Sequence, residues 1–139
     1  MKARIKWTDG RQFVAESGSG HSLVIDGHPD HGGRNTGPRP MELLLMGLGG
    51  CSSFDVIDIL AKARAQVTDC VAELEAVRAD AVPAVFEKIH LHFVVSGHAL
   101  KEAQVKRAVE LSAQKYCSAS IMLAKGGVEI THSFEIRES

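Results

Sequence analysis

The segment Pro40–Ala65 constrains the fold more than any other part of the sequence, because it is the most apolar stretch and contains no strong helix breaker. Its first turns have no polar face, and apolar residues continue along one side as far as Leu60. It is therefore predicted to form one long helix enclosed by other elements, with an uncharged part too short to cross a membrane. Gly47, Gly49 and Gly50 each cost about 1 kcal/mol relative to alanine inside a helix, which predicts the close approach of another backbone.

Cys51 directly follows these glycines. Because a helical side chain leans toward the N-terminus, its sulfur is predicted to lie over Gly47, which leaves a small pocket above the thiol. Asp55 and Asp58 follow one and two turns later and oppose ionisation of this thiol, so a cation must come from elsewhere. Glu42 precedes Cys51 by ~13 Å of helical rise and lies on roughly the opposite side, so it could reach the sulfur only across a dimer.

The rest of the chain shows strand and helix patterns on both sides of this segment. Strands are predicted at Lys2–Thr8, Arg11–Ser17, His21–Asp26, Val67–Ala79, Glu87–Val95 and Val128–Ile136. An amphipathic helix is predicted at Leu100–Tyr116, followed by a short helix that Ser118 caps. The order βββ-α-ββ-αα-β predicts one α+β domain over residues 1–139, with antiparallel strands wrapped around the central helix. One chain has few strands to wrap that helix, which favours an intertwined homodimer.

Charge and cysteine content exclude several classes of protein. A net charge of −1 without a basic cluster argues against nucleic acid or an anionic membrane as partner. The N-terminus has no continuous hydrophobic segment, so we expect no secretory signal and a cytoplasmic protein. Three widely spaced cysteines predict neither a disulfide scaffold nor a zinc knuckle, and in a reducing cytosol a thiol pair is more often reactive than structural. The loop between Asp26 and Arg39 is long and rich in glycine and proline, so it is either functional or mobile.

The cysteines differ in their local sequence. Cys117 precedes a predicted helix start, where free N–H groups and the helix dipole favour a thiolate, so a depressed pKa is predicted. Cys70 lies on the apolar side of a strand and is interpreted as a packing residue. For Cys51 and Cys117 the pattern alone leaves chemistry and core packing open.

The histidines suggest a metal site only weakly. His90 and His92 share one strand face, and His28 and His31 lie in the long loop, but solvated histidines are commoner than ligands. We expect no metal and no organic cofactor. His132 lies on the apolar side of the last strand, so it is either hydrogen-bonded in the core or close to the thiols.

Two motifs together resemble the OsmC/Ohr family, the osmotically inducible and organic hydroperoxide resistance proteins. They are GPRPMELLLMGLGGCSSFDVIDIL and, some sixty residues later, KYCSASIML, and the resemblance covers essentially the whole chain. It implies an intertwined homodimer with two active sites at the subunit interface. It also implies thiols that reduce organic hydroperoxides with electrons from a dithiol such as a lipoyl protein. By position, Cys51 matches the peroxidatic cysteine and Cys117 the resolving cysteine.

The chain departs from the best-characterised members in the residues that would activate the thiol. In those members the glutamate that orients the catalytic arginine directly follows the proline. Here Met41 holds that position and Glu42 follows it, which resembles a divergent OsmC-like branch. No cation aligns uniquely, and the candidates are Arg11, Arg34, Arg39 and, as a weaker substitute, His21.

The resulting hypothesis is a thiol peroxidase that acts on organic hydroperoxides. Cys51 would form a sulfenic acid, Cys117 would condense with it to a disulfide, and an external dithiol would reduce the disulfide. The alternative is a binding module of the same fold, whose pocket holds a small ligand while its cysteines sense oxidation without turnover.

Overall fold

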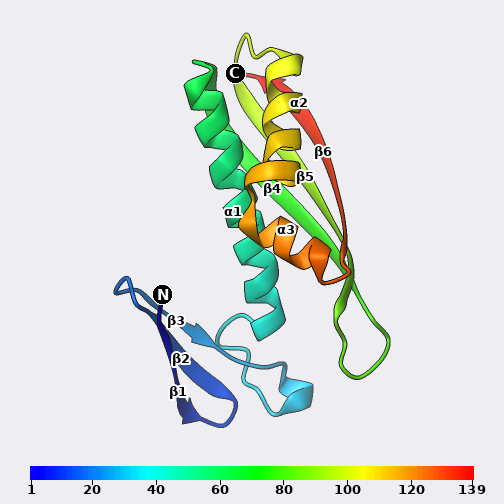
Figure 1. Ribbon diagram of the computed structural model, residues 1–139. Coiled ribbons are helices and arrows are strands. Elements are labelled where there is room, and N and C mark those ends of the chain that lie inside the picture. Colours follow the sequence, from blue (N-terminus) through cyan, green and yellow to red (C-terminus); the bar gives the residue numbers. More distant parts are fainter. The chain divides into compact units, whose positions relative to one another are not determined.

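The computed structural model describes residues 1–139, which form two compact units, Met1–Leu44 and Leu45–Ser139. The boundary lies within the first turns of helix α1 (Pro40–Lys62), the long central helix of the sequence (Figure 1). Three strands precede α1, and two strands, two helices and a strand follow it, so the predicted α+β order is confirmed. A single domain over the whole chain stays a prediction.

The first unit contains an antiparallel sheet of three strands in the order β1-β2-β3. Its strands are β1 (Ala3–Asp9), β2 (Gln12–Ser17) and β3 (Ser22–Ile25). The first strand was predicted to bury one face, but all seven of its residues are exposed, and Trp7 is 58% exposed. Alternation determines which side chains share a face of a strand, but not whether a further layer covers that face.

Asp26 organises the long loop that follows β3. Its buried carboxylate accepts hydrogen bonds from the backbone N–H groups of Gly27 (2.7 Å), Arg34 (3.3 Å) and Thr36 (3.2 Å), and from the Thr36 hydroxyl. The short 3-10 helix η1 (Pro29–His31) lies within the span that these bonds close. The hydrogen bonds, that of the Thr36 side chain foremost, lower the pKa of Asp26 from 3.8 to about 2.

This carboxylate gives the fold a defined acid sensitivity. Its pKa is lower in the folded chain, so its stabilisation is complete above about pH 4 and is lost as the pH falls toward 2. We expect Asp26→Asn to lower the thermal midpoint at pH 7 by several degrees and to flatten the fall in stability below pH 4. Thermal unfolding followed by circular dichroism checks this, with exposed Asp30→Asn as the control. Equal losses in the two variants would contradict the assignment.

The second unit contains a sheet in the order β4-β5-β6. Strands β4 (Gln66–Arg78) and β5 (Phe86–His98) form the predicted antiparallel hairpin. Strand β6 (Glu129–Glu138) pairs with β5 in parallel, where antiparallel strands were expected. Parallel neighbours need a long crossover, and helix α2 (Glu102–Leu111), the π-helical turn η2 (Ser112–Tyr116) and helix α3 (Ser118–Lys125) supply it. The helix predicted over Leu100–Tyr116 is thus divided at Leu111.

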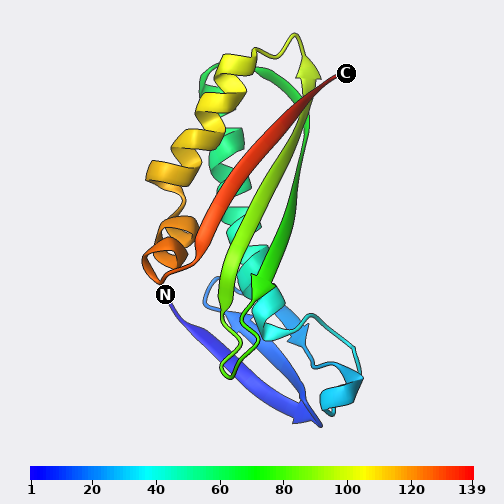
Figure 2. The ribbon, with the colours of Figure 1, turned by 90° about the vertical axis from the view of Figure 1, so that its right-hand side faces the viewer.

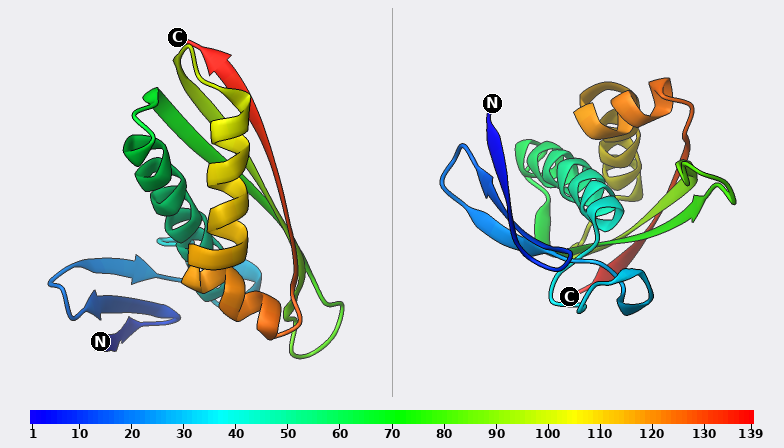
Figure 3. Two further views of the ribbon diagram at one scale, coloured as in Figure 1. Left: turned by 45° about the horizontal axis from the view of Figure 1, so that its top comes forward. Right: turned by 90° about the horizontal axis from the view of Figure 1, so that it is seen from below.

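The helices of this unit lie over one face of its sheet, as Figures 2 and 3 show. The core between these layers is formed by apolar side chains of α1, β5 and α2. They are Leu48, Val56, Leu60, Ile89, Leu91, Phe93, Val95, Val105, Ala108 and Val109. The apolar side chains of β5, which alternate along the strand, and those of α2, which recur at helical spacing, therefore pack into one core. Contacts with this core hold α1 against the sheet.

Helix α1 is buried on one side only within this chain. The expected complete enclosure is not met, since Met46, Phe54 and Ile57 stay exposed, Phe54 by 76%. At Gly49 a Cβ atom would lie 2.9 Å from Leu74 Cδ1, so this glycine admits a side chain of β4 rather than another backbone. The other two glycines of the run have no neighbouring atoms within 4 Å of such a Cβ.

The length and composition of α1 bear on whether it could cross a membrane. The helix as a whole is long and apolar enough to do so, whereas its part without a charged residue, 43–54, is short, as expected. Of its most apolar window, 28% is buried within the chain. The core helix of a soluble protein satisfies the same criterion, so this property is weak support for a membrane segment.

Candidate active site

Cys51 and Cys117 lie close together beside Asp55. Cys51 and Asp55 are one turn apart on α1, and Cys117 immediately precedes α3. Both sulfur atoms and one carboxylate oxygen of Asp55 lie within 4.8 Å of one another, and both cysteines are free thiols. The fold therefore unites the two cysteines that the motifs singled out, while their separate chemical roles stay predictions.

Cys117, rather than the predicted Ser118, is the N-cap of α3. Its extended backbone precedes the helix, and its sulfur accepts a hydrogen bond from the Ser120 N–H at 3.4 Å. Ser52 Oγ lies 3.1 Å from the same sulfur. Burial raises the pKa of the Cys117 thiol, and the contacts with Ser52 and Ser120 offset this only in part. The predicted depression of its pKa is wrong, because desolvation outweighs the helix N-terminus.

Ser112 connects this cluster to η2. Its hydroxyl lies 3.3 Å from Asp55 Oδ2 and 3.3 Å from the Ser52 carbonyl oxygen, so it can donate to either. Neither Ser52 nor Ser112 was identified from the sequence. The available signal was a serine on the apolar stripe of the predicted helix Leu100–Tyr116, because a polar residue in a buried position needs a partner.

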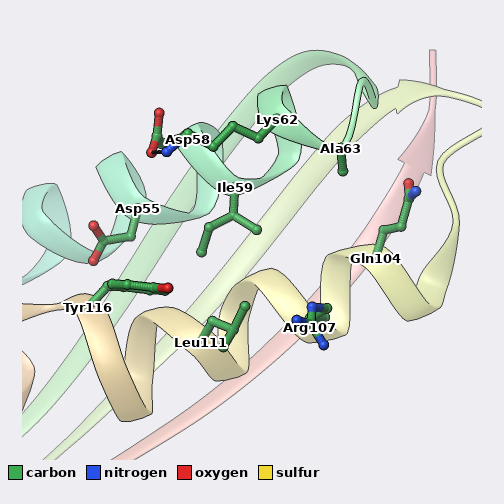
Figure 4. Close-up of a pocket in the computed structure, with 9 residues that line it drawn as sticks. All are labelled: Asp55, Asp58, Ile59, Lys62, Ala63, Gln104, Arg107, Leu111 and Tyr116. Carbon is green, nitrogen blue, oxygen red and sulfur yellow. Dashed lines mark hydrogen bonds and ion pairs between the residues drawn. The ribbon is translucent and has the colours of Figure 1, made fainter.

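A cavity of about 470 Å³ adjoins the cluster and shares Asp55 with it. Figure 4 shows side chains of α1 and α2 on its two sides, with Tyr116 of η2 near Asp55. Ile59, Leu111 and Tyr116 give it apolar surface, while Asp58 pairs with Lys62 at 2.8 Å. Arg107 also lines it and forms no ion pair within the chain. The cavity beside the cluster thus combines apolar surface with an arginine that has no ion-pair partner in the chain.

Glu42 occupies the third position of α1, in the first unit. Its carboxylate accepts a hydrogen bond from the Arg39 N–H at 2.9 Å and lies 3.8 Å from Arg39 Nε. This is the contact that a glutamate in the first turn makes with the helix cap. The other candidate cations have different partners in the same unit: Arg34 pairs with Asp9, Arg11 bonds to the Gly10 carbonyl oxygen and His21 contacts Ser19. Arg39 is therefore the candidate that Glu42 contacts.

The third cysteine and the histidines lie outside the cluster. Cys70 is half-buried on β4, and burial raises the pKa of its thiol. His90 contacts the hydroxyls of Thr131 and Ser133, at 2.6 and 2.7 Å. His92 contacts Ser133 at 2.7 Å and Glu135 at 3.2 Å. Both ring nitrogens of each histidine are therefore engaged with β6.

His132 fits neither of the two alternatives set out for it. Its Nε2 atom is buried without a hydrogen-bond partner, and it does not belong to the thiol cluster. It lines a second cavity of about 460 Å³ together with Phe134 of β6 and residues of α2 and η2. Burial, reinforced by His90, lowers the pKa of His132, so the ring is held in its neutral form.

The sequence matches the family model described as OsmC-like protein over residues 32–133. The chain belongs to the OsmC-like family. It is 48% identical over 136 residues to protein YhfA of Escherichia coli strain K12, and the match covers 98% of each chain. The resemblance found in the two cysteine motifs is thereby confirmed.

Solved structures carry the same fold. A hypothetical protein from Aquifex aeolicus VF5 is 29% identical with a TM-score of 0.86, covering 99% of this chain and 96% of that chain. An organic hydroperoxide resistance protein OsmC from Legionella pneumophila has a TM-score of 0.73 at 18% identity, covering 96% of this chain and 95% of that chain. At 18% identity, the similarity to the Legionella protein shows the fold of this OsmC-like protein and nothing further.

Proposed function

We propose that this OsmC-like protein is a thiol-dependent peroxidase that reduces organic hydroperoxides in oxidative-stress defence. The observation that carries the proposal is the placement of the Cys51 and Cys117 sulfurs within 4.8 Å of each other, both as free thiols. The adjoining cavity has room and apolar surface for an organic group. Similarity in fold to a hydroperoxide resistance protein supports the substrate class.

The different burial of the two cysteines suggests their order of action. Cys51 is partly exposed, whereas Cys117 is fully buried and its raised pKa keeps it protonated at rest. In the proposed reaction the Cys51 thiolate attacks the O–O bond, the alcohol leaves with a proton, and Cys51 becomes a sulfenic acid. The Cys117 sulfur then attacks Cys51, an S–S bond forms and water leaves. An external dithiol such as a lipoyl protein reduces the disulfide.

Positive charge near Cys51 has to offset the neighbouring Asp55 carboxylate. We assign this role to Arg39, which Glu42 contacts, acting in a homodimer where the two chains complete each other's sites. The exposed apolar side chains of α1 support such a dimer. We place the protein in the cytoplasm, where reducing conditions keep the thiols available.

A steady-state assay tests the peroxidase directly. The purified protein is supplied with tert-butyl hydroperoxide and excess dihydrolipoamide, and peroxide loss is measured over time. Many equivalents should be consumed per chain, with little loss when the dithiol is omitted. Consumption that stops at one equivalent despite excess dithiol would contradict turnover. It would favour the alternative sensor, whose cysteines oxidise once and alter the binding of a ligand in the cavity.

One stoichiometric equivalent of peroxide should form an intrachain disulfide between Cys51 and Cys117 and leave Cys70 reduced. The reason is that the Cys51 and Cys117 sulfurs lie within 4.8 Å of each other, whereas Cys70 is not part of this cluster. Alkylation of free thiols followed by peptide mapping identifies the bridge. A main bridge through Cys70, or a fully reduced protein after treatment, would count against the proposed pairing.

Glu42→Gln should slow the reaction of Cys51 about tenfold at neutral pH. Glutamine keeps the oxygen that accepts the Arg39 N–H, so helix capping survives while the charge that holds the guanidinium is lost. The pH profile of Cys51 alkylation should move to higher pH, and Arg39→Gln should reproduce that shift. Glu129→Gln, which removes a carboxylate from an exposed ion pair with Lys88, is the control for alkylation. An unchanged profile would assign Glu42 a structural role only.

A further inference from the structure

We propose that Cys51, Cys117 and Asp55 form a binding site for a thiophilic divalent cation, with zinc as the expected ion. Two sulfurs and a carboxylate oxygen within 4.8 Å of one another are a donor set that zinc prefers. Around a tetrahedral zinc, such atoms lie about 3.5–3.8 Å apart, given bond lengths of about 2.3 Å to sulfur and 2.1 Å to oxygen. Side-chain shifts of about 1 Å therefore complete the site.

The surroundings support these three donors as ligands. Ser52 Oγ contacts the Cys117 sulfur at 3.1 Å, and the Ser112 hydroxyl lies 3.3 Å from the Asp55 carboxylate. Hydrogen-bonded neighbours of this kind orient metal ligands and hold them in place. Cys51 and Asp55 are partly exposed, so an ion can enter and a water molecule can take the fourth coordination position.

The negative charge of Asp55 also favours a metal site at the two thiols. Asp55 opposes a thiolate at Cys51, so its position beside both sulfurs is unfavourable for a bare dithiolate. The same carboxylate favours a divalent cation, because it brings the ligand charge to −3 when both thiols are ionised. The peroxidase mechanism gives Asp55 no role, whereas a metal site explains why this carboxylate lies beside the two thiols.

The histidines named as possible ligands are less suited to this ion. His90 and His92 have both ring nitrogens occupied by hydroxyl and carboxylate partners on β6. Neither belongs to the group of close ligand atoms. The proposed site departs from our expectation of no metal, which was based on the wide spacing of the cysteines and on the weak signal of the histidines.

Metal and peroxide should compete for the same thiols. Zinc binding releases any protons that the two cysteines still hold and leaves Cys51 and Cys117 as zinc-bound thiolates. One hydroperoxide and two protons then yield the Cys51–Cys117 disulfide, one alcohol, one water and free zinc, with both electrons coming from the thiolates. This release step rests on the proposed peroxidase chemistry, whereas zinc binding does not.

Zinc affinity and stoichiometry are measured with zinc chloride in competition with a chromophoric chelator. The ligands of the metal are probed by replacing zinc with cobalt, added as cobalt chloride. The reduced protein should hold one zinc ion per chain, and its cobalt form should show a thiolate-to-cobalt charge-transfer band. Cys51→Ser and Cys117→Ser should each weaken the band, and Asp55→Asn should lower zinc affinity at least about tenfold. Cys70→Ser and Asp30→Asn, at positions outside the cluster, serve as controls that keep zinc affinity. Circular dichroism checks that each variant is folded.

Two results would overturn the site. One is failure of the folded, reduced wild type to compete with the chelator for zinc. The other is zinc binding that survives in Cys51→Ser and Asp55→Asn but is lost when His90 and His92 are replaced by glutamine. Peroxide turnover by metal-free protein is measured separately. If turnover is absent while the protein still binds one zinc ion per chain and shows the cobalt band, the peroxidase proposal fails and the zinc site stands. If the protein turns over peroxide but does not bind zinc, the zinc site fails and the peroxidase proposal stands.

Discussion

Cys51→Ser is expected to abolish peroxide consumption, with a loss of at least about a thousandfold, because it removes the attacking sulfur. Cys117→Ser should behave differently. Its Cys51 can still attack one hydroperoxide, so about one equivalent per chain should be consumed before the reaction stops at the sulfenic acid. Peroxide loss and a sulfenic-acid-specific label, measured on both variants, reveal this asymmetry.

Cys70→Ser is the matched control for these variants, since it removes a half-buried thiol outside the cluster. It should consume peroxide at the wild-type rate. Equal behaviour of Cys51→Ser and Cys117→Ser would contradict the assigned order of attack. Consumption of many equivalents by Cys117→Ser with dihydrolipoamide would show that the external dithiol resolves the sulfenic acid without a second cysteine.

The second large effect concerns assembly. The wild type should be a homodimer at micromolar concentration, because α1 exposes Met46, Phe54 and Ile57 along an apolar helix. Phe54→Glu should raise the dimer dissociation constant at least about a hundredfold, since burying an unpaired carboxylate costs several kcal/mol. Light scattering at several concentrations measures the change.

Ala103→Glu introduces the same charge at an exposed position of α2 and is the control for this experiment. It should leave the dimer intact if the contact is made through α1. A stable wild-type monomer at micromolar concentration would contradict the dimer. It would also remove the route by which we propose that Arg39 of one chain acts in the site of its partner.

Local patterns in the sequence determined most of the element order. The apolar run from Pro40 predicted α1, and alternating side chains predicted the strands on both sides of it. The two cysteine motifs were enough to recognise the family, which the match over residues 32–133 confirms. These features depend on neighbouring residues along the chain, so they can be read without knowledge of tertiary contacts.

Tertiary structure decided the features that depend on distant residues. The parallel pairing of β5 with β6 follows from the crossover through α2 and α3, which alternation within a strand cannot reveal. The raised pKa of Cys117 follows from its burial, whereas the sequence showed only the helix start that would lower it. Asp55 lies beside both thiols, Ser52 contacts that of Cys117, and Ser112 contacts Asp55, because α1 packs beside η2. Desolvation and side-chain contacts depend on how distant segments pack against each other. The pKa of Cys117 and the contacts of the thiol cluster could therefore be determined only from the tertiary structure.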